Sequence, residues 1–241
     1  MTYDLITITW NSEKTLQRTL DSVAAQKQAP HRYIFIDGGS EDNTCKIIEQ
    51  FKTAHPAIDV ILEQQRAKGI SQAWNQALPY LQSELVALLN SDDWWLDDTM
   101  SRVLHHFNND PSSDILSGSI LYTQNENDPA PKLMRTRSLK LFPVLMPIMH
   151  PACFIKKSVY DEIGGFDEEL KTSMDYDFIY RCLNAKCHFK SVNEVFTYMQ
   201  AGGMANANRI RARQETRDVA LKHGPLCIPR VAYLARVLRN R

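Results

Sequence analysis

The feature that most restricts the fold of this chain is the alternation of short apolar runs with amphipathic segments in its first 90 residues. Runs rich in β-branched and aromatic residues at 5–9, 33–36 and 60–62, and the apolar run 85–89, predict four strands. Between these runs, apolar residues recur at helical spacing, as Ala73, Ala77 and Leu81 do in the helix expected over 69–81. Strands that alternate with helices form parallel sheets with right-handed crossovers. The sequence therefore predicts an α/β fold with a mostly parallel sheet flanked by helices.

The rest of the chain predicts further elements around an irregular middle section. Residues 124–149 contain several prolines and indicate a loop or hairpin that shapes a second pocket. Two basic helices are expected at 209–223 and 228–240, separated by Gly224-Pro225. The other helices and strands that we expect lie at about 99–107, 173–183, 115–123, 153–156 and 192–200.

Polar residues follow three of the four N-terminal strands at the point where each strand ends. Parallel strands end at a common edge of the sheet, and ligands of open α/β sheets bind just beyond that edge. Three polar clusters on one edge make a site of nucleotide size plausible. The clusters are Thr9-Trp10-Asn11, Asp37-Gly38-Gly39-Ser40 and Asn90-Ser91-Asp92-Asp93.

Asp92 and Asp93 lie directly beyond the apolar run 85–89. Two adjacent carboxylates repel each other unless a proton or a cation intervenes. A hard divalent cation that also binds phosphate oxygens is the natural partner for them. The alternative, from this stretch alone, is that one of the two acids caps the next helix, since Asp is a favoured N-cap residue.

The charges are unevenly distributed, although the formal net charge is zero. Residues 209–241 contain nine Lys or Arg and two acids, so this tail carries +7 and residues 1–208 carry −7. A basic tail on an acidic body predicts an anionic partner such as a membrane surface. After Pro229, apolar residues at helical spacing alternate with arginines, which suits a helix in the membrane interface. The alternative is a tail packed back on the acidic body.

The five cysteines, an odd number without a CxxC pair, argue against disulfides and against a zinc knuckle. The N-terminus leads directly into a strand, without the basic region and apolar core of a secretory signal. No apolar run approaches the length of a membrane span. We therefore expect a cytoplasmic protein that can associate with the inner face of a membrane.

The order of these signals resembles that of a family 2 glycosyltransferase with the GT-A fold. Each motif is weak alone, but six in the right order are specific, and the resemblance covers about residues 3–205. It implies a GT-A domain over 1–208, with a nucleotide-sugar half to about 110 and an acceptor half over 111–208, followed by the basic helical extension 209–241. The matching motifs are Trp10-Asn11, IDGGS at 36–40, GISQAWNQA at 69–77, NSDD at 90–93, GGFDEEL at 164–170 and MDYDF at 174–178.

The resemblance implies roles for residues of the nucleotide-sugar pocket. Asp37 stands where an acid of the family reads the edge of the base, and Thr9 and Asn11 line the same pocket. Lys68 is a candidate for contact with phosphate or sugar, and Asn75 for contact with ribose or sugar. For both, a solvated polar residue on the surface is the alternative.

NSDD takes the place of the family's DxD metal motif, with Asn90 in place of the first acid. Asp92 is then the expected ligand of Mn²⁺ or Mg²⁺ bound to the diphosphate, and Asp93 is expected beside the sugar. Such a metal would neutralise the leaving diphosphate as a Lewis acid.

MDYDF supplies the expected catalytic base, which would accept the proton of the acceptor hydroxyl. Asp175 matches the second acid of the family's ED motif, and Met174 replaces the Glu that often precedes it. That departure leaves Asp177 open as the base. Helix capping is the alternative role of Asp175.

The implied function is inverting, metal-dependent transfer from a nucleotide-diphosphate sugar, with UDP favoured, to a hydroxyl of a glycan or lipid-linked glycan in surface polysaccharide biosynthesis. A nucleotidyltransferase would need a Gly-rich phosphate loop after the first strand, and residues 10–13 contain no glycine. A catalytically inactive GT-A domain that binds sugar nucleotides or assembles with partners stays open because of Asn90 and Met174. No nucleic-acid partner is expected.

Overall fold

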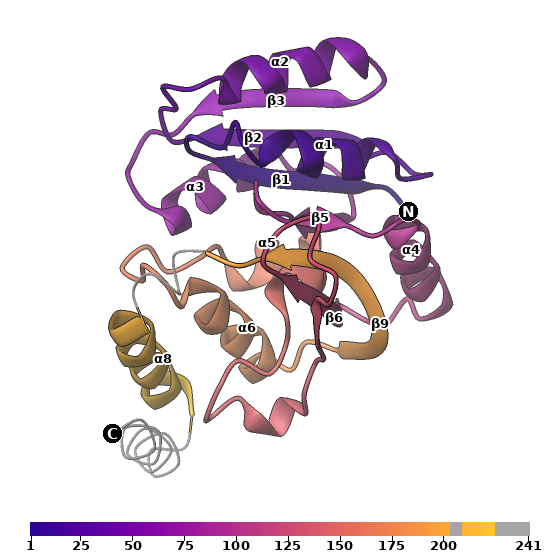
Figure 1. The fold of residues 1–241 in the computed structure, drawn as a ribbon. Helices are drawn as coiled ribbons and strands as arrows, with labels where there is room; N and C mark the ends of the chain where they lie inside the picture. Colours follow the sequence, from indigo (N-terminus) through magenta and orange to yellow (C-terminus); the bar gives the residue numbers. More distant parts are fainter. Residues whose placement is uncertain (203–208, 225–241) are drawn as a thin grey trace.

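The computed structural model describes residues 1–202 and 209–224, which form a nine-stranded sheet with helices on both faces (Figure 1). The strands are β1 (Tyr3–Thr9), β2 (Arg32–Asp37), β3 (Asp59–Gln64), β4 (Leu85–Leu88), β5 (Trp94–Trp95), β6 (Ile115–Thr123), β7 (Lys132–Met134), β8 (Cys153–Lys156) and β9 (Phe189–Gln200). The helices are α1 (Leu16–Ala24), α2 (Thr44–Ala54), α3 (Ile70–Ala77), α4 (Thr99–Asn109), α5 (Lys157–Ile163), α6 (Met174–Asn184) and α8 (Arg209–His223), with short 3-10 turns η1 (Leu78–Tyr80), η2 (Leu139–Leu141) and η3 (His150–Ala152).

The N-terminal strands lie in the order β3-β2-β1-β4, and every neighbouring pair among them is parallel. β8 continues the sheet antiparallel to β4, and the order then runs β6-β9-β5. β6 and β9 are parallel, while β7 forms an antiparallel hairpin with β6. The predicted α/β class and the parallel N-terminal sheet are confirmed, and the hairpin expected within 124–149 is present.

Alternate residues of each N-terminal strand enter the hydrophobic core on opposite faces of the sheet. Tyr33 and Phe35 pack with α1, α2 and α4, whereas Ile34 and Ile36 pack with α3, α5, α6 and α8. All four of these side chains are fully buried. Because both faces are covered, side chains on both sides of β1, β2 and β4 are mostly apolar, and this explains the apolar runs in the sequence.

Several boundaries differ from those expected, each for a local reason. The helix predicted to run through Leu81 ends at Ala77, and Pro79 lies in the 3-10 turn that follows. α5 and β5 were not predicted, because seven and two residues are too few to show a period. The second predicted basic helix, at 228–240, lies outside the described residues. In the part of the chain that is described, no helix is long and apolar enough to cross a bilayer.

Helix α8, expected at the start of a separate extension, packs directly against α6 (Figure 1). Val219 and Ala220 are each 2% exposed and belong to the same hydrophobic cluster as α6. Lys222 Nζ lies 3.1 Å from Asp167 Oδ2, which adds an ion pair on the surface. Residues 209–223 of the basic tail thus pack on the acidic body, which was the alternative to association of this part of the tail with a membrane.

Glu215 of α8 holds the segment that leads into α6. Its carboxylate accepts hydrogen bonds from the backbone N–H groups of Lys171, Thr172 and Ser173 at 2.8 to 3.2 Å. Donors at the start of a helix have no partner within it, so an acceptor from another element stabilises them. Burial alone would raise the pKa of Glu215, but hydrogen bonds from the side chain and N–H of Thr172, from Arg211 and from the N–H of Lys171 outweigh it and hold the pKa below its ordinary value.

We expect Glu215→Gln to lower the free energy of unfolding by about 2 kcal/mol at pH 7, because hydrogen bonds to a charged acceptor are lost. The pKa of Glu215 is lower in the folded than in the unfolded state, so its contribution is present above the unfolded pKa of about 4.3 and disappears as the pH falls through the folded pKa. Urea unfolding of both proteins between neutral and acidic pH measures the difference. Glu49→Gln, on the exposed face of α2, is the control, and a difference independent of pH would contradict this role.

Candidate functional site

The three predicted polar clusters meet at the carboxyl ends of β1, β2 and β4. Thr9 lies opposite Asp37 in the register of β1 and β2, and Thr9 Oγ1 donates a hydrogen bond to Asp37 Oδ1 at 2.8 Å. The hydroxyl oxygens of Ser12 and Ser91 are 2.9 Å apart and join the loop after β1 to the loop after β4. The expectation that these clusters share one edge of the sheet is confirmed.

Asp37 is 4% exposed and organises the turn after β2. Its Oδ1 accepts from Thr9 Oγ1 and from Ser40 Oγ at 2.6 Å, and its Oδ2 accepts from the N–H groups of Gly39 and Ser40 at 3.0 and 2.7 Å. Burial favours the neutral acid, but hydrogen bonds from Ser40, Thr9 and Gly39 hold its pKa below the ordinary value. Gly39 has a φ of 87°, which suits glycine. The carboxylate thus uses both oxygens to shape the edge of the site, and contact with a base stays a prediction.

The loops after β1 and β2 are bonded to each other. Asn11, at a φ of 48°, donates its N–H to Ser40 Oγ at 2.8 Å, and its side-chain oxygen accepts the N–H of Glu41 at 2.9 Å. Trp10, which precedes Asn11 in the loop after β1, is 69% exposed. The predicted pocket residues Thr9, Asn11 and Asp37 therefore form one connected framework.

Asp93 is 1% exposed and links the loop after β4 to the end of β9. Its Oδ2 accepts from Asn90 Nδ2 at 2.9 Å, and its Oδ1 accepts from the N–H of Gln200 at 3.0 Å. Burial, followed by the charge of Asp92, raises the pKa of Asp93 to about 7. The structure thus engages both oxygens of Asp93 within the protein, and its predicted place beside the sugar stays a prediction.

Arg18 of α1 is a residue of this edge that the sequence did not indicate. Its guanidinium donates to the backbone oxygen of Asp92 at 3.0 Å and to the side chain of Gln200. It lies 3.7 Å from the centroid of the Trp94 ring, which stacks on Tyr198 with 4.9 Å between centroids. An arginine on an amphipathic helix has the pattern of a solvated surface residue, so spacing alone could not reveal it.

The residues at this edge fit a divalent cation held jointly with phosphate. Among residues 1–202 and 209–224, no cluster of three or more His, Cys, Asp or Glu could hold a metal by itself. Burial raises the pKa of the half-buried Asp92, and Arg18 opposes the rise. Mg²⁺ commonly takes one or two carboxylates and completes its shell with phosphate oxygens and water. Asp92 has the chemistry for that single protein ligand.

The two acids of MDYDF have different surroundings on α6, as residues two apart on a helix point about 200° away from each other. Burial lowers the pKa of His150, and the nearby Asp175 carboxylate opposes that fall, so these two groups are neighbours. Asp177 is fully buried and accepts from Arg181 Nε at 2.8 Å, and it lies 2.7 Å from His223 Nε2. Asp177 is therefore engaged in an ion-pair network that includes α8.

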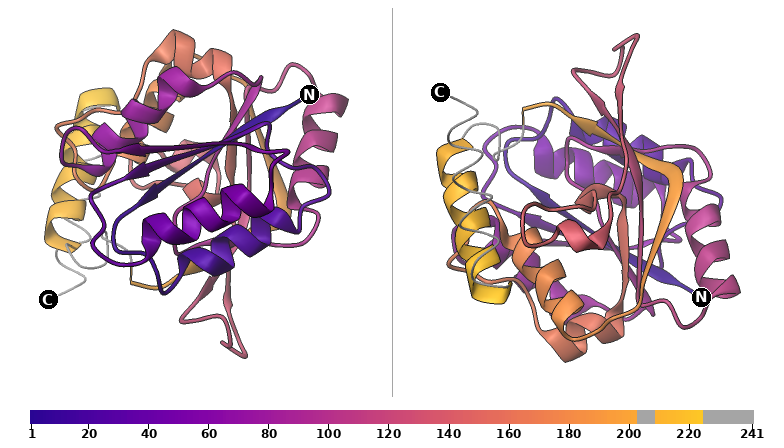
Figure 2. Two further views of the ribbon diagram at one scale, coloured as in Figure 1. Left: turned by 90° about the horizontal axis from the view of Figure 1, so that it is seen from above. Right: turned by 90° about the horizontal axis from the view of Figure 1, so that it is seen from below.

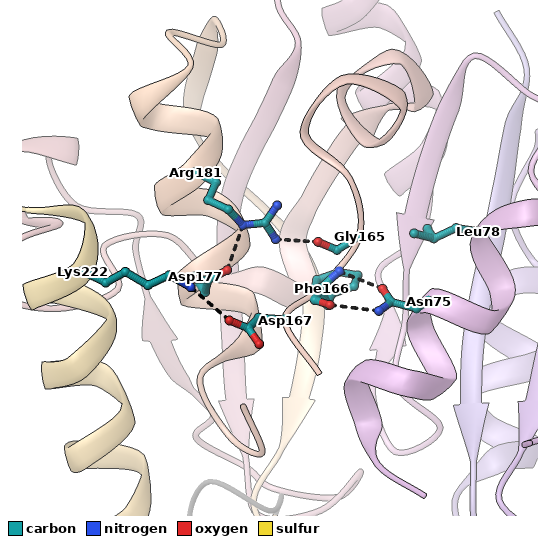
Figure 3. A pocket seen from close by; sticks show the side chains of 8 residues that line it. All are labelled: Asn75, Leu78, Gly165, Phe166, Asp167, Asp177, Arg181 and Lys222. Atoms are coloured by element: carbon teal, nitrogen blue, oxygen red, sulfur yellow. Dashed lines mark hydrogen bonds and ion pairs between the residues drawn. The ribbon is translucent and has the colours of Figure 1, made fainter. Parts of the chain in front are cut away.

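A pocket of about 340 Å³ lies between α3, α6 and α8, away from the strand ends (Figure 3). Its charged groups are paired with each other, since Asp177 bonds to Arg181 and Asp167 to Lys222. Residues 124–149, which were expected to shape a second pocket, do not line this one. The lining residues are Asn75, Leu78, Gly165, Phe166, Asp167, Asp177, Arg181 and Lys222.

Asn75 and Lys68 do not join the framework around Asp37. The amide of Asn75 donates to the backbone oxygen of Phe166 at 2.9 Å and accepts its N–H at 2.7 Å (Figure 3). It thus fixes α3 to the loop before α6. Lys68 is exposed, and its side chain has no polar partner among the described residues. The predicted sugar and phosphate contacts of these two residues stay predictions.

Comparison with known proteins gives a family and a fold. A family model described as Glycosyl transferase family 2 matches residues 4–164. A PGL/p-HBAD biosynthesis glycosyltransferase of Mycobacterium tuberculosis is 24% identical over 207 residues, which are 85% of this chain and 79% of that protein.

Two solved structures share the fold. TarS 1-349 of S. aureus in complex with UDP has a TM-score of 0.70 at 21% identity, covering 92% of this chain and 65% of that chain. Mannosyltransferase PcManGT from Pyrobaculum calidifontis, in complex with GDP-Man and Mn²⁺, has a TM-score of 0.69 at 18% identity, covering 94% and 66%. This chain spans 39% of a longer TarS structure. The GT-A-type fold expected from the sequence is confirmed.

We expect Asp37→Asn to lower the free energy of unfolding by about 2 to 4 kcal/mol. Each carboxylate oxygen of Asp37 accepts two hydrogen bonds, whereas the amide NH₂ that replaces one of them accepts none. Two buried N–H or O–H donors then lose their acceptor, and each such unpaired group costs about 1–3 kcal/mol. Denaturant unfolding measures the loss. The control is Asp21→Asn on the exposed side of α1, which should change little, and equal stability of the two variants would contradict the role given to Asp37.

Proposed function

Because the chain belongs to glycosyl transferase family 2, we propose that it transfers a sugar from a nucleoside-diphosphate sugar to a hydroxyl of a glycan or lipid-linked glycan. The observation that carries the proposal is the framework of Thr9, Asn11 and Asp37 beside Asp92 at one sheet edge. UDP is the favoured nucleotide, and the UDP complex of TarS supports it. The GDP-Man complex of PcManGT makes GDP the second nucleotide to be tested.

On the donor side, Asp92 is the proposed ligand of Mn²⁺ or Mg²⁺, and Thr9, Asn11 and Asp37 frame the nucleotide. The metal, when bound with the diphosphate, supplies positive charge that stabilises the leaving group. Arg18 holds the backbone of Asp92 in place and adds a further positive charge near the same edge. Lys68, on the turn before α3, is free to reach a phosphate or sugar.

On the acceptor side, Asp175 is the proposed general base. It takes the proton of the acceptor hydroxyl while that oxygen bonds to the anomeric carbon and the bond to the diphosphate breaks. A single displacement of this kind inverts the anomeric centre and needs no covalent nucleophile. The engagement of Asp177 with Arg181 and His223 supports Asp175 rather than Asp177 in this role.

The second candidate is a catalytically inactive GT-A domain that binds sugar nucleotides or assembles with partners. It is favoured by Asn90 and Met174, which replace acids of the family motifs. Asn90 bonds to Asp93, and Met174 is 7% exposed in the core, so both have packing roles of their own. Transfer of labelled sugar from UDP-sugars in the presence of Mn²⁺ distinguishes the two candidates.

The proposed domain boundary moves from residue 208 to residue 224, since α8 shares the core with α6. Truncation after 208 would remove Glu215 and the buried Val219. The proposed association of the basic tail with the inner face of an anionic membrane therefore depends on residues after 224. Flotation with liposomes should compare the full chain with residues 1–224.

We expect Asp92→Ala to weaken Mn²⁺-dependent binding of UDP-sugar by at least about 100-fold while the protein stays folded. The reason is that losing a metal ligand costs more affinity than losing a residue that only orients a ligand. Calorimetric titration with and without Mn²⁺ measures it. Asp97→Ala, at an exposed acid in the turn between β5 and α4, is the control, and unchanged turnover in Asp92→Ala would contradict the metal assignment.

We expect Asp175→Asn to lower kcat by about 10²- to 10⁴-fold and to leave donor affinity nearly unchanged, because a base acts on the acceptor. Asp177→Asn should lower stability but retain turnover, since it disrupts the pair with Arg181 and His223. Activity in Asp175→Asn together with none in a folded Asp177→Asn would assign the base to the other carboxylate.

A further inference from the structure

One stretch of the surface combines positive charge with exposed apolar side chains. Residues 129–160 contain six Lys or Arg and no Asp or Glu, although residues 1–208 carry −7 overall. Within this stretch, residues 135–147 form a loop, called the basic loop below, whose neck is closed by a hydrogen bond from Arg137 N–H to the Pro147 oxygen at 2.7 Å. By its colour, this segment is seen on the face turned to the viewer in the right panel of Figure 2.

The cations of the basic loop are not used within the protein. Arg135, Arg137 and Lys140 are exposed, and none of these side chains makes a hydrogen bond or ion pair with another residue of 1–202 or 209–224. Arg102 and Lys157, by contrast, lie beside carboxylates at 3.4 and 2.7 Å. Unpaired cations grouped on one loop of a body with opposite net charge attract an anionic partner.

Apolar side chains lie among these charges. Leu141 is 36% exposed and belongs to neither hydrophobic cluster of the described residues. Val144, Leu145 and Met146 are half-buried on the same loop. Exposed leucine beside unpaired Lys and Arg suits the boundary between head groups and acyl chains, where the apolar groups enter and the cations meet anionic lipid. A soluble polyanion would use the charges but would gain nothing from Leu141.

The basic loop is fixed next to the proposed base. Phe142 is fully buried, its ring stacks on Tyr176 with 5.9 Å between centroids, and Tyr176 Oη donates to the Phe142 oxygen. Tyr176 directly follows Asp175 in α6. The loop is therefore anchored by its centre to the helix that carries the acceptor-side carboxylate, while Lys140 and Leu141 remain outside.

We propose that the basic loop, residues 135–147, is a membrane-docking surface that places the protein on an anionic lipid bilayer with the Asp175 side of the molecule next to it. Binding to the bilayer does not depend on transfer, whereas the delivery of a lipid-linked acceptor to Asp175 rests on the proposed function. The basic loop is distinct from the basic tail, residues 209–241. Wild type and every variant in the test below retain the tail, so the tail contributes equally to the binding of all of them.

The test is sedimentation of the full chain with vesicles of phosphatidylcholine alone or mixed with phosphatidylglycerol, at low salt. Wild type should bind the mixed vesicles only. Arg137→Ala/Lys140→Ala should bind them about 25-fold more weakly, as each cation near an anionic surface contributes about fivefold. Leu141→Gln should weaken binding severalfold. The thermal midpoints of these variants should stay at the wild-type value, because the altered side chains have no polar partner in the described structure.

The matched control is Lys46→Ala/Lys52→Ala, which removes the same charge from the exposed side of α2, at the far end of the molecule from the basic loop (Figure 1). It should change binding by no more than about twofold, because distant surface charges are screened. The proposal is overturned if wild type ignores the mixed vesicles or if Arg137→Ala/Lys140→Ala binds like the control. It is also overturned if polyglutamate displaces the protein and Leu141→Gln binds like wild type, which would assign the loop to a soluble polyanion.

Discussion

The parallel pairing of β1 between β2 and β4 is the constraint on which the site depends. It brings Thr9 opposite Asp37 and lets Ser12 and Ser91 bond across the gap between two loops. The strands are buried on both faces, and the polar residues of the site lie at their ends, where the chain leaves the core. Polar side chains from three separate segments of the chain, around positions 9, 37 and 92, thereby gather at one edge.

On α6, one helix turn places two carboxylates in different surroundings. Asp177 is buried and bonded to Arg181 and to His223 of α8, so it stabilises the packing of α8. Asp175 lies in the surroundings of His150, on the helix that also anchors the basic loop through Tyr176. Docking of α8 and presentation of Asp175 are thus consequences of one helix orientation.

Local patterns predicted the strands other than β5 and β7, the shared edge and the motifs, because apolar runs and strand-end polar residues are properties of short segments. They did not predict Arg18, whose partners Asp92 and Gln200 lie 74 and 182 residues away. They also could not show that Glu215 would hold the start of α6, or that Asn75 would bind the backbone at Phe166. Such roles depend on which elements become neighbours, and tertiary packing decides that.

The most direct test of the central claim is a crystal structure with an unreactive UDP-sugar and Mn²⁺. The account predicts the nucleotide at the carboxyl ends of β1, β2 and β4, with the metal about 2.1 Å from a carboxylate oxygen of Asp92 and from the diphosphate. A nucleotide bound instead in the pocket beside Arg181 and Lys222, or a metal without contact to Asp92, would contradict it.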